Sequence, residues 1–189
     1  MQKFFFILEK AQIPKAITNS SKSKNKPSER LDILHQCLMS ILDSPLNKEK
    51  DIEIYVLPEN NNSIIKVSNQ MKIPRTLERF NGLLKELNKK LKVKNDKNEV
   101  MMSFKKGPLD EILNSSVYKI GLSDEGNVLE KKIFEGKGDV AFFINCIAKG
   151  SDDNLKNKDG FYKVSNYPLS AFVVCVKVCT IIEDYLGVY

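Results

Sequence analysis

The chain has 189 residues, with 30 lysines and arginines against 24 aspartates and glutamates, so its formal net charge is +6. This length suits one domain or at most two, and the 42% hydrophobic fraction is enough for a sizeable core. The composition argues against a disordered tail, a collagen-like rod and a membrane bundle, while the positive excess favours an anionic partner, most simply nucleic acid.

The first third of the chain predicts a strand, a loop, a helix and a hairpin, in that order. Residues 3–9 are apolar and aromatic, as in a buried strand, whereas residues 15–29 are rich in serine, lysine and asparagine and predict a flexible basic loop. Leucines and isoleucines at helical spacing predict a helix over residues 31–43. Strands at 52–57 and 63–67, separated by a Pro-Glu-Asn-Asn-Asn run, predict a hairpin.

The rest of the chain alternates between predicted strands and two longer helices. One helix is expected over residues 74–91, with a proline in its first turn. The other, over residues 169–186, is apolar nearly all round, so it is expected to be buried in a core or in a subunit interface. Further strands are expected at residues 100–104, 117–122, 140–147 and 161–164. Because strands alternate with helices, the sequence predicts an α/β fold with a mostly parallel sheet flanked by helices.

Cysteine usage and the apolar segments bear on the compartment. The apolar start of the chain is stopped by Glu9 and Lys10, so no secretory signal is expected, and the apolar stretch 169–182 is too short to span a bilayer. The four cysteines form no C-x-x-C pair and there is one histidine, so no zinc site is expected. The cysteines are interpreted as buried thiols in a reducing compartment.

The segment 71–97 accounts for the whole charge excess, because it holds nine basic residues against three acidic ones. The apolar stripe of its helix is predicted to consist of Leu77, Phe80, Leu84, Leu87 and Leu91. Arg75 and Arg79 lie roughly opposite that stripe, and Gly82 lies beside them. Like charges four residues apart and a helical glycine both destabilise a helix, which a polyanion lying across this face would explain. An ordinary solvated helix face is the alternative on these grounds alone.

Two other patterns do not hold as catalytic motifs. Gly136, Gly138 and Ala141 match a loose dinucleotide fingerprint, but they precede a predicted strand instead of following one. His35 has no identifiable nucleophile partner and is expected to be structural.

Three segments carry a resemblance to a known family. They are residues 32–38 (DILHQCL) continuing to 42–47 (LDSPLN), residues 73–83 (IPRTLERFNGL), and residues 165–171 (SNYPLSA). In this order the chain resembles the eukaryotic and archaeal small-subunit ribosomal RNA pseudouridine-N1-methyltransferases, ribosome-biogenesis proteins of the SPOUT superfamily. The resemblance covers about residues 30–189.

The resemblance implies both a fold and an activity. It implies a single SPOUT methyltransferase domain over residues 1–189, an α/β knot with a carboxy-terminal trefoil, and a homodimer. It implies S-adenosylmethionine as cofactor, methylation of N1 of a pseudouridine in small-subunit (18S) rRNA, and other ribosome assembly factors as partners. No metal or membrane partner is implied. The location implied is the nucleolus or nucleus, and otherwise the cytoplasm.

The residues that match the family's motifs carry specific expectations. Arg30, Lys72, Arg75 and Arg79 match RNA-contacting positions, and Asp32 matches the acid that orients Arg30. Asp32 is also the candidate catalytic residue. The cofactor-binding positions expected from the resemblance are Leu122, Asn145, Gly150, Val164, Ser165, Asn166, Tyr167, Pro168 and Leu169. An arginine cluster suits a splayed RNA loop, because guanidinium groups bind phosphate and stack on bases.

Four positions depart from the family pattern. Leu31 replaces a proline, Lys72 replaces an arginine, Leu122 replaces a hydroxyl residue, and Asn145 replaces the first glycine of a cofactor loop. The departures at Leu122 and Asn145 motivate an alternative, a non-catalytic rRNA-binding assembly factor with the same fold. A more distant alternative is a generic small-molecule-binding α/β protein whose basic helix only aids solubility.

Overall fold

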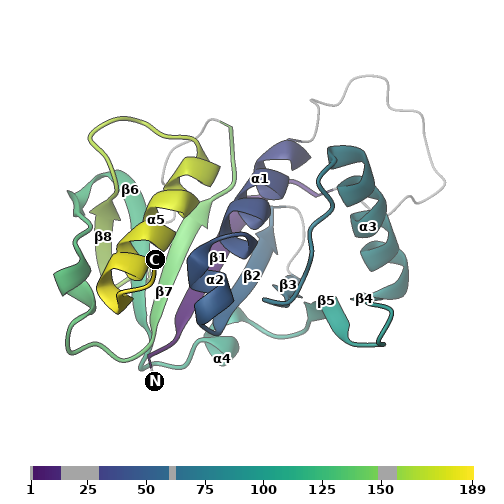
Figure 1. Cartoon of the computed structure of the whole chain (residues 1–189), viewed down its shortest axis with the longest axis horizontal. Helices are drawn as coiled ribbons and strands as arrows, with labels where there is room; N and C mark the ends of the chain where they lie inside the picture. The colour runs from purple at the N-terminus through teal and green to yellow at the C-terminus, as the bar shows by residue number, and fades with distance from the viewer. Residues whose placement is uncertain (1, 14–29, 60–62, 149–156) are drawn as a thin grey trace.

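The computed structural model of the chain describes residues 2–13, 30–59, 63–148 and 157–189. The strands in these ranges form one mixed sheet of eight strands in the order β4-β5-β3-β2-β1-β7-β6-β8, which runs across the width of the molecule (Figure 1). The predicted α/β fold with helices flanking a sheet is thereby confirmed. The expected loop 15–29 lies outside the described residues.

Five neighbouring strands of the sheet are parallel, and they form its larger part. They are β2 (Ile52–Pro58), β1 (Phe4–Ala11), β7 (Val140–Asn145), β6 (Tyr118–Val128) and β8 (Gly160–Lys163). The central strands β1 and β7 are buried on both faces, as the continuous apolar run at 140–147 predicts. Alternate side chains of β1, such as Phe6 and Ile7, enter two different apolar clusters on opposite faces of the sheet.

The remaining three strands are antiparallel and extend the sheet beyond β2. They are β3 (Ile64–Val67), β5 (Val100–Lys105) and β4 (Lys92–Lys94), which is the edge strand. The pairing of β2 with β3 confirms the predicted hairpin. Strand β4 was not expected from the sequence, since its pattern KVK is hidden within a lysine-rich helix exit.

The helices are divided unequally between the two faces of the sheet (Figure 1). The front face, as we call it, is covered by α1 (Leu31–Leu42), α2 (Pro45–Glu49), α3 (Leu77–Lys90) and α5 (Ala171–Leu186). The back face is covered by the short α4 (Leu109–Ile112) and the residues that follow it. A 3₁₀ turn, η1 (Lys131–Phe134), packs Phe134 against α5 through the ring of Tyr185.

Two of the front helices have ends that the local sequence explains. Helix α2 begins after Ser44, whose hydroxyl oxygen accepts a hydrogen bond from the backbone N–H of Asn47, with Pro45 at the first helical position. Helix α5 ends at Gly187, which has a φ of 66° and supplies the left-handed residue that helix ends favour.

Helix α3 differs from its prediction at both ends. It begins at Leu77 after an extended Thr76, so Pro74 lies before the helix and not in its first turn. Phe80, Leu84 and Leu87 are buried as the stripe predicts, but Leu77 and Leu91 are 42% and 60% exposed. The buried stripe is therefore one turn shorter at each end than the sequence predicts. At the carboxyl end the reason is that the chain leaves the helical path at Leu91, which has a φ of 62°.

Helix α5 is only partly buried in the monomer. Cys175, Val178, Cys179 and Ile182 face the core, whereas Phe172 and Val176 remain 37% and 44% exposed. Of the helices in the described part of the chain, none has the length and apolar character that crossing a bilayer requires.

Candidate functional site

A cavity of about 740 Å³ lies where the parallel strands β7 and β8 reach their carboxyl ends, beside residues 122–125 of β6. This is the edge at which parallel sheets usually bind ligands, and the volume lies within the range of small-molecule sites. Its walls come from the ends of these strands, the loop that leads into α5, and the first turns of α1 and α5.

The cavity brings together most of the residues that the family resemblance marks as cofactor-binding. Those that line it are Leu122, Asn145, Val164, Ser165, Tyr167, Pro168 and Leu169. Asn166 is exposed and is not part of the lining, and Gly150 lies outside the described residues. Three loops far apart in sequence therefore meet at one site, which gives a small molecule several walls to contact.

A looped-out segment of β6 forms one wall that the sequence reasoning missed. Leu122 and Asn127 both pair with Tyr162 of β8, so residues 123–126 bulge out between them. Gly126 allows this, because a Cβ there would come within 2.6 Å of the β8 backbone. Asp124 and Glu125 on the bulge line the cavity. A polar run directly after a predicted parallel strand is the signal that could have identified them.

The backbone at Asn145 removes one reason for a glycine at this position. Asn145 is the last residue of β7, pairs with Glu9 of β1, and does not have a positive φ. An asparagine side chain is therefore compatible with the local backbone. What remains different from the family pattern is that a side chain, half-buried, now occupies the cavity wall.

A buried ion pair fixes the segment that enters β8. The ammonium of Lys158 lies 3.0 Å from a carboxylate oxygen of Glu9, with both side chains almost fully buried, and it also lies over the ring of Phe143 at 4.5 Å. Glu9 is near the end of β1, so this pair ties the start of β8 to the centre of the sheet. Tyr162 and Lys163, which line the cavity, follow a few residues later.

Arg30 and Asp32 form a bidentate pair at the rim of the cavity. The Nε and Nη2 groups of Arg30 donate hydrogen bonds of 2.9 Å and 2.8 Å to the two carboxylate oxygens of Asp32, and Arg30 also lines the cavity. The hydrogen bond from Arg30 holds the pKa of Asp32 below its ordinary value of 3.8. Asp32 is therefore an ionised group already engaged on both oxygens, which makes it a weak proton acceptor.

The other basic residues expected to bind RNA lie in the segment before α3 and in its first turn. Arg75 forms an ion pair with Asp43, the residue that follows α1, and both side chains are exposed. Lys72 and Arg79 are exposed, and among the described residues neither takes part in an ion pair. An exposed pair contributes little to stability, so a phosphate can displace Asp43 from Arg75 without a large energetic penalty.

His35 joins this surface to α1. Its ring is buried, stacks on Phe80 with 4.8 Å between the ring centroids, and lies 2.7 Å from the carbonyl oxygen of Pro74. A carbonyl oxygen only accepts, so Nε2 carries the proton and donates it. His35 therefore holds the turn that carries Arg75 against α1, which is the structural role that the sequence analysis expected.

The four cysteines are free and buried, as interpreted from the sequence. The sulfurs of Cys37 and Cys146 lie 3.9 Å apart between α1 and the end of β7. No set of three or more potential metal-ligating side chains is found in the described ranges. All four belong to the large apolar cluster under the front helices.

Comparison with known proteins identifies similar sequences over nearly the whole chain. A family model described as EMG1/NEP1 methyltransferase matches residues 2–183. The ribosomal RNA small subunit methyltransferase NEP1 of Candida glabrata is 36% identical over 159 residues, which are 82% of this chain and 69% of that protein. The protein mra1 of Schizosaccharomyces pombe, with the same description, is 35% identical over 88% of this chain and 48% of its own length. The chain thus spans between about half and two thirds of these relatives.

A solved structure has the same fold. The crystal structure of Archaeoglobus fulgidus Nep1 bound to S-adenosylhomocysteine superposes with a TM-score of 0.75, covering 98% of this chain and 99% of that chain at 23% identity. This likeness shows that the mixed sheet and its flanking helices are those of that protein.

Proposed function

The chain belongs to the EMG1/NEP1 methyltransferase family, and from that premise we propose that it methylates N1 of a pseudouridine in small-subunit (18S) rRNA, with S-adenosylmethionine as methyl donor. The family membership confirms the resemblance predicted from the three motifs. The proposed activity supports a role in ribosome small-subunit biogenesis.

The observation that carries the proposal is the convergence of the expected cofactor residues on one cavity. The cavity has Arg30 on its rim, so a small molecule inside it and an RNA loop outside it would meet at one place. Apolar side chains such as Leu122 and Leu169 suit the adenine ring, and the turn at Ser165, whose hydroxyl accepts from the N–H of Tyr167, presents backbone polar groups. The residues present fit an adenosyl cofactor.

The chain's own contribution is positioning. When bound, S-adenosylmethionine supplies a methyl group on a sulfonium that is open to nucleophilic attack. Asp32 fixes the guanidinium plane of Arg30, which is half exposed and has N–H groups left to hold an RNA phosphate or a face to stack on a base. Holding the base and the cofactor in one geometry lowers the barrier by removing the entropy of their encounter. Asp32 is assigned this positioning role, because both of its oxygens are engaged.

The finer features that the family resemblance implies are part of the same proposal. We propose that the carboxy-terminal part is tied in a deep trefoil knot, and that residues 1–189 form a single domain. The single sheet through the described strands supports the latter. We also propose a homodimer, which the exposed apolar residues Phe172 and Val176 on α5 support, because a second copy would remove them from water. We propose, finally, that the protein has other ribosome assembly factors as partners and is located in the nucleolus or nucleus.

The decisive experiment is transfer of a labelled methyl group from S-adenosylmethionine to an rRNA stem-loop that contains pseudouridine. The matched control is the same stem-loop with uridine, whose N1 is occupied by the glycosidic bond. We expect label only in the pseudouridine RNA. Equal label in both RNAs, or none in either, would contradict the proposed reaction.

The non-catalytic assembly factor is the second candidate, and Leu122 and Asn145 in the cavity wall favour it. A calorimetric titration with S-adenosylmethionine separates the two functions. We expect binding, because the backbone at Asn145 is ordinary extended strand and the cavity is well formed. An absence of binding at millimolar cofactor together with retained affinity for the stem-loop would establish the assembly-factor function instead.

A further inference from the structure

The back face of the antiparallel strands carries a second group of lysines, which the sequence alone does not bring together. Lys92 of β4 pairs with Ser103 of β5, and Ser103 pairs with Lys66 of β3. Lys66 in turn pairs with Tyr55 of β2, which belongs to the apolar cluster of the back face. Because directly paired residues of neighbouring strands share a face, this whole row lies on the back.

Two more lysines belong to the same face. Lys105 of β5 pairs with Ile64, which is also in the back-face cluster. Lys94 follows Lys92 by two residues, with the buried Val93 between them facing the front cluster. We call Lys66, Lys92, Lys94 and Lys105 the back-face lysine row. Lys92, Lys94 and Lys105 are exposed.

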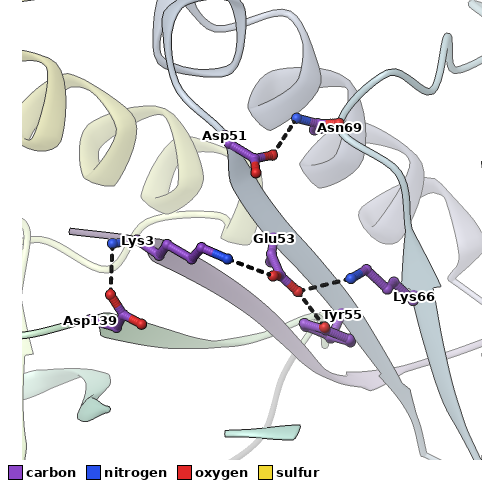
Figure 2. Close-up of polar contacts among 7 residues, drawn as sticks. All are labelled: Lys3, Asp51, Glu53, Tyr55, Lys66, Asn69 and Asp139. Atoms are coloured by element: carbon purple, nitrogen blue, oxygen red, sulfur yellow. Dashed lines mark hydrogen bonds and ion pairs between the residues drawn. The ribbon is translucent and has the colours of Figure 1, made fainter. Parts of the chain in front are cut away.

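The acidic residue that forms an ion pair with Lys66 of this row is already neutralised. Glu53 of β2 lies between Lys3 and Lys66, at 3.7 Å and 3.0 Å, and also accepts a 2.5 Å hydrogen bond from the hydroxyl of Tyr55, as Figure 2 shows. Burial alone would raise the pKa of Glu53, but Tyr55, Lys66 and Lys3 together lower it, so the carboxylate is charged and fully engaged. Within the described ranges, no ion pair involves Lys92, Lys94 or Lys105.

Protection of the sheet edge explains only part of this arrangement. Lysines on an edge strand such as β4 discourage edge-to-edge aggregation, which accounts for Lys92 and Lys94. Lys66 and Lys105 lie on β3 and β5, which are paired on both sides and need no such protection. Lys66 already has Glu53 as its partner, so it is the exposed charge of Lys105 that the edge argument leaves unexplained.

The back-face lysine row is continuous with the basic residues of α3. Helix α3 ends at Lys90 and β4 begins at Lys92, so the chain passes directly from the front of the sheet to its edge (Figure 1). Lys92 and Lys94 are about 6.6 Å apart along the strand. A polyanion that lies on the front of α3 thus meets further positive charge where it passes the β4 edge.

We propose that the back-face lysine row binds the phosphate backbone of rRNA that flanks the segment held by Arg75 and Arg79. This inference rests on the proposed function, because the front contact places the RNA. RNA is favoured over an acidic protein because the lysines form an extended row along neighbouring strands, which suits a uniform chain of phosphates. Lysine contacts of this kind add affinity that depends on salt and carry no base specificity.

The test compares two RNAs and two double variants. The RNAs are a minimal pseudouridine stem-loop and a longer rRNA fragment that carries the same stem-loop with its flanking helices. The test variant is Lys92→Gln/Lys105→Gln, and the matched control is Lys131→Gln/Lys137→Gln, which removes two exposed lysines near η1. For the longer fragment at low salt we expect the test variant to bind roughly tenfold more weakly, with a salt slope shallower by about 1.5. The control should bind like the wild type.

Binding of polyglutamate, a probe for an acidic protein partner, is measured beside the two RNAs, and two outcomes overturn the inference. An unchanged affinity of the test variant for the longer fragment overturns the inference. The inference is also overturned if the test variant loses binding to polyglutamate but still binds the longer RNA, because the partner of the row is then an acidic protein. Stem-loop binding by an Arg75→Ala/Arg79→Ala variant is measured in parallel and tests the proposed function separately. Thermal unfolding confirms that each variant is folded.

Discussion

The parallel part of the sheet, β2-β1-β7-β6-β8, and the antiparallel part, β3-β5-β4, place their polar groups differently. In the parallel part the strand ends and their loops enclose a cavity, with polar residues pointing into it from several segments. In the antiparallel part and α3 the charges are exposed and spread over both faces. A small molecule needs walls on several sides, whereas an RNA backbone needs positive charge along an extended surface. This difference supports the proposed division, in which the cofactor binds in the parallel part and most RNA contacts lie in the antiparallel part and α3, with Arg30 between them.

The largest expected effect comes from Arg75→Ala/Arg79→Ala. Loss of two charge-assisted contacts should weaken stem-loop binding roughly hundredfold, with a salt slope shallower by about 1.4–1.8. Calorimetric affinity for S-adenosylmethionine should not change, because neither arginine lines the cavity. The control Arg75→Lys/Arg79→Lys keeps the charge and should lose less. Undiminished RNA affinity in the alanine variant would mean that α3 is an ordinary solvated helix.

The next effect is expected at the cavity, from Gly126→Ala. The added Cβ would meet the β8 backbone at 2.6 Å, so the bulge or β8 must move. We expect the free energy of unfolding to fall by about 1–3 kcal/mol and cofactor affinity to fall with it. Denaturant unfolding and calorimetry measure the two quantities. RNA affinity at low temperature, where the variant is folded, should stay close to that of the wild type. If RNA affinity fell as much as cofactor affinity, the two parts of the sheet would not bind their ligands separately.

A smaller effect of opposite sign is expected from Gly82→Ala on α3. The added Cβ meets no atom within 4 Å, so the variant should gain helix propensity, about 0.5–1 kcal/mol, and melt about 2–3 °C higher. If RNA phosphates approach this face closely, stem-loop affinity should fall despite the gain in stability. Melting curves and filter binding check the two statements. Unchanged RNA affinity would show that the missing side chain at Gly82 is not needed for RNA to approach α3.

The smallest effect concerns the pH dependence of the Arg30–Asp32 pair. In the folded protein the pKa of Asp32 lies below its ordinary value of 3.8. The contribution of the pair to folding stability is therefore present above pH 3.8 and is lost as the pH falls through the lowered pKa of Asp32. Between pH 5 and 8 the pair should stay intact. A carbon NMR titration of the Asp32 carboxyl would show this, and a midpoint above 4 would contradict the positioning role.

Periodicity predicted much of the fold, because helices and buried strands leave a regular pattern of apolar residues. Helix α1, the β2–β3 hairpin and the double-sided burial of β7 follow from such patterns. Strand β4 and the extension of β6 to Val128 could not be predicted in this way. Both depend on pairing with strands distant in sequence, which supplies hydrogen bonds that a local pattern does not reveal.

The residues of the candidate site also fall into those that the sequence predicted and those that only the structure revealed. Motif resemblance named the loop at 164–169 and the basic residues Arg30, Lys72, Arg75 and Arg79, but not the bulge with Asp124 and Glu125. It could not show that Asp43 pairs with Arg75, since 32 residues separate them in the chain. Contacts of that kind depend on where α1 and the segment before α3 lie in space.

The net charge of +6 shows what the sequence and the tertiary structure each determine. The sequence by itself located the whole excess in residues 71–97 and indicated an anionic partner. Only the tertiary structure divided that charge between the front of α3 and the back of β4, and added Lys66 and Lys105 from the rest of the chain, which is neutral as a whole. The physical reason is that strand alternation, set by pairing across the sheet, decides which face each lysine occupies.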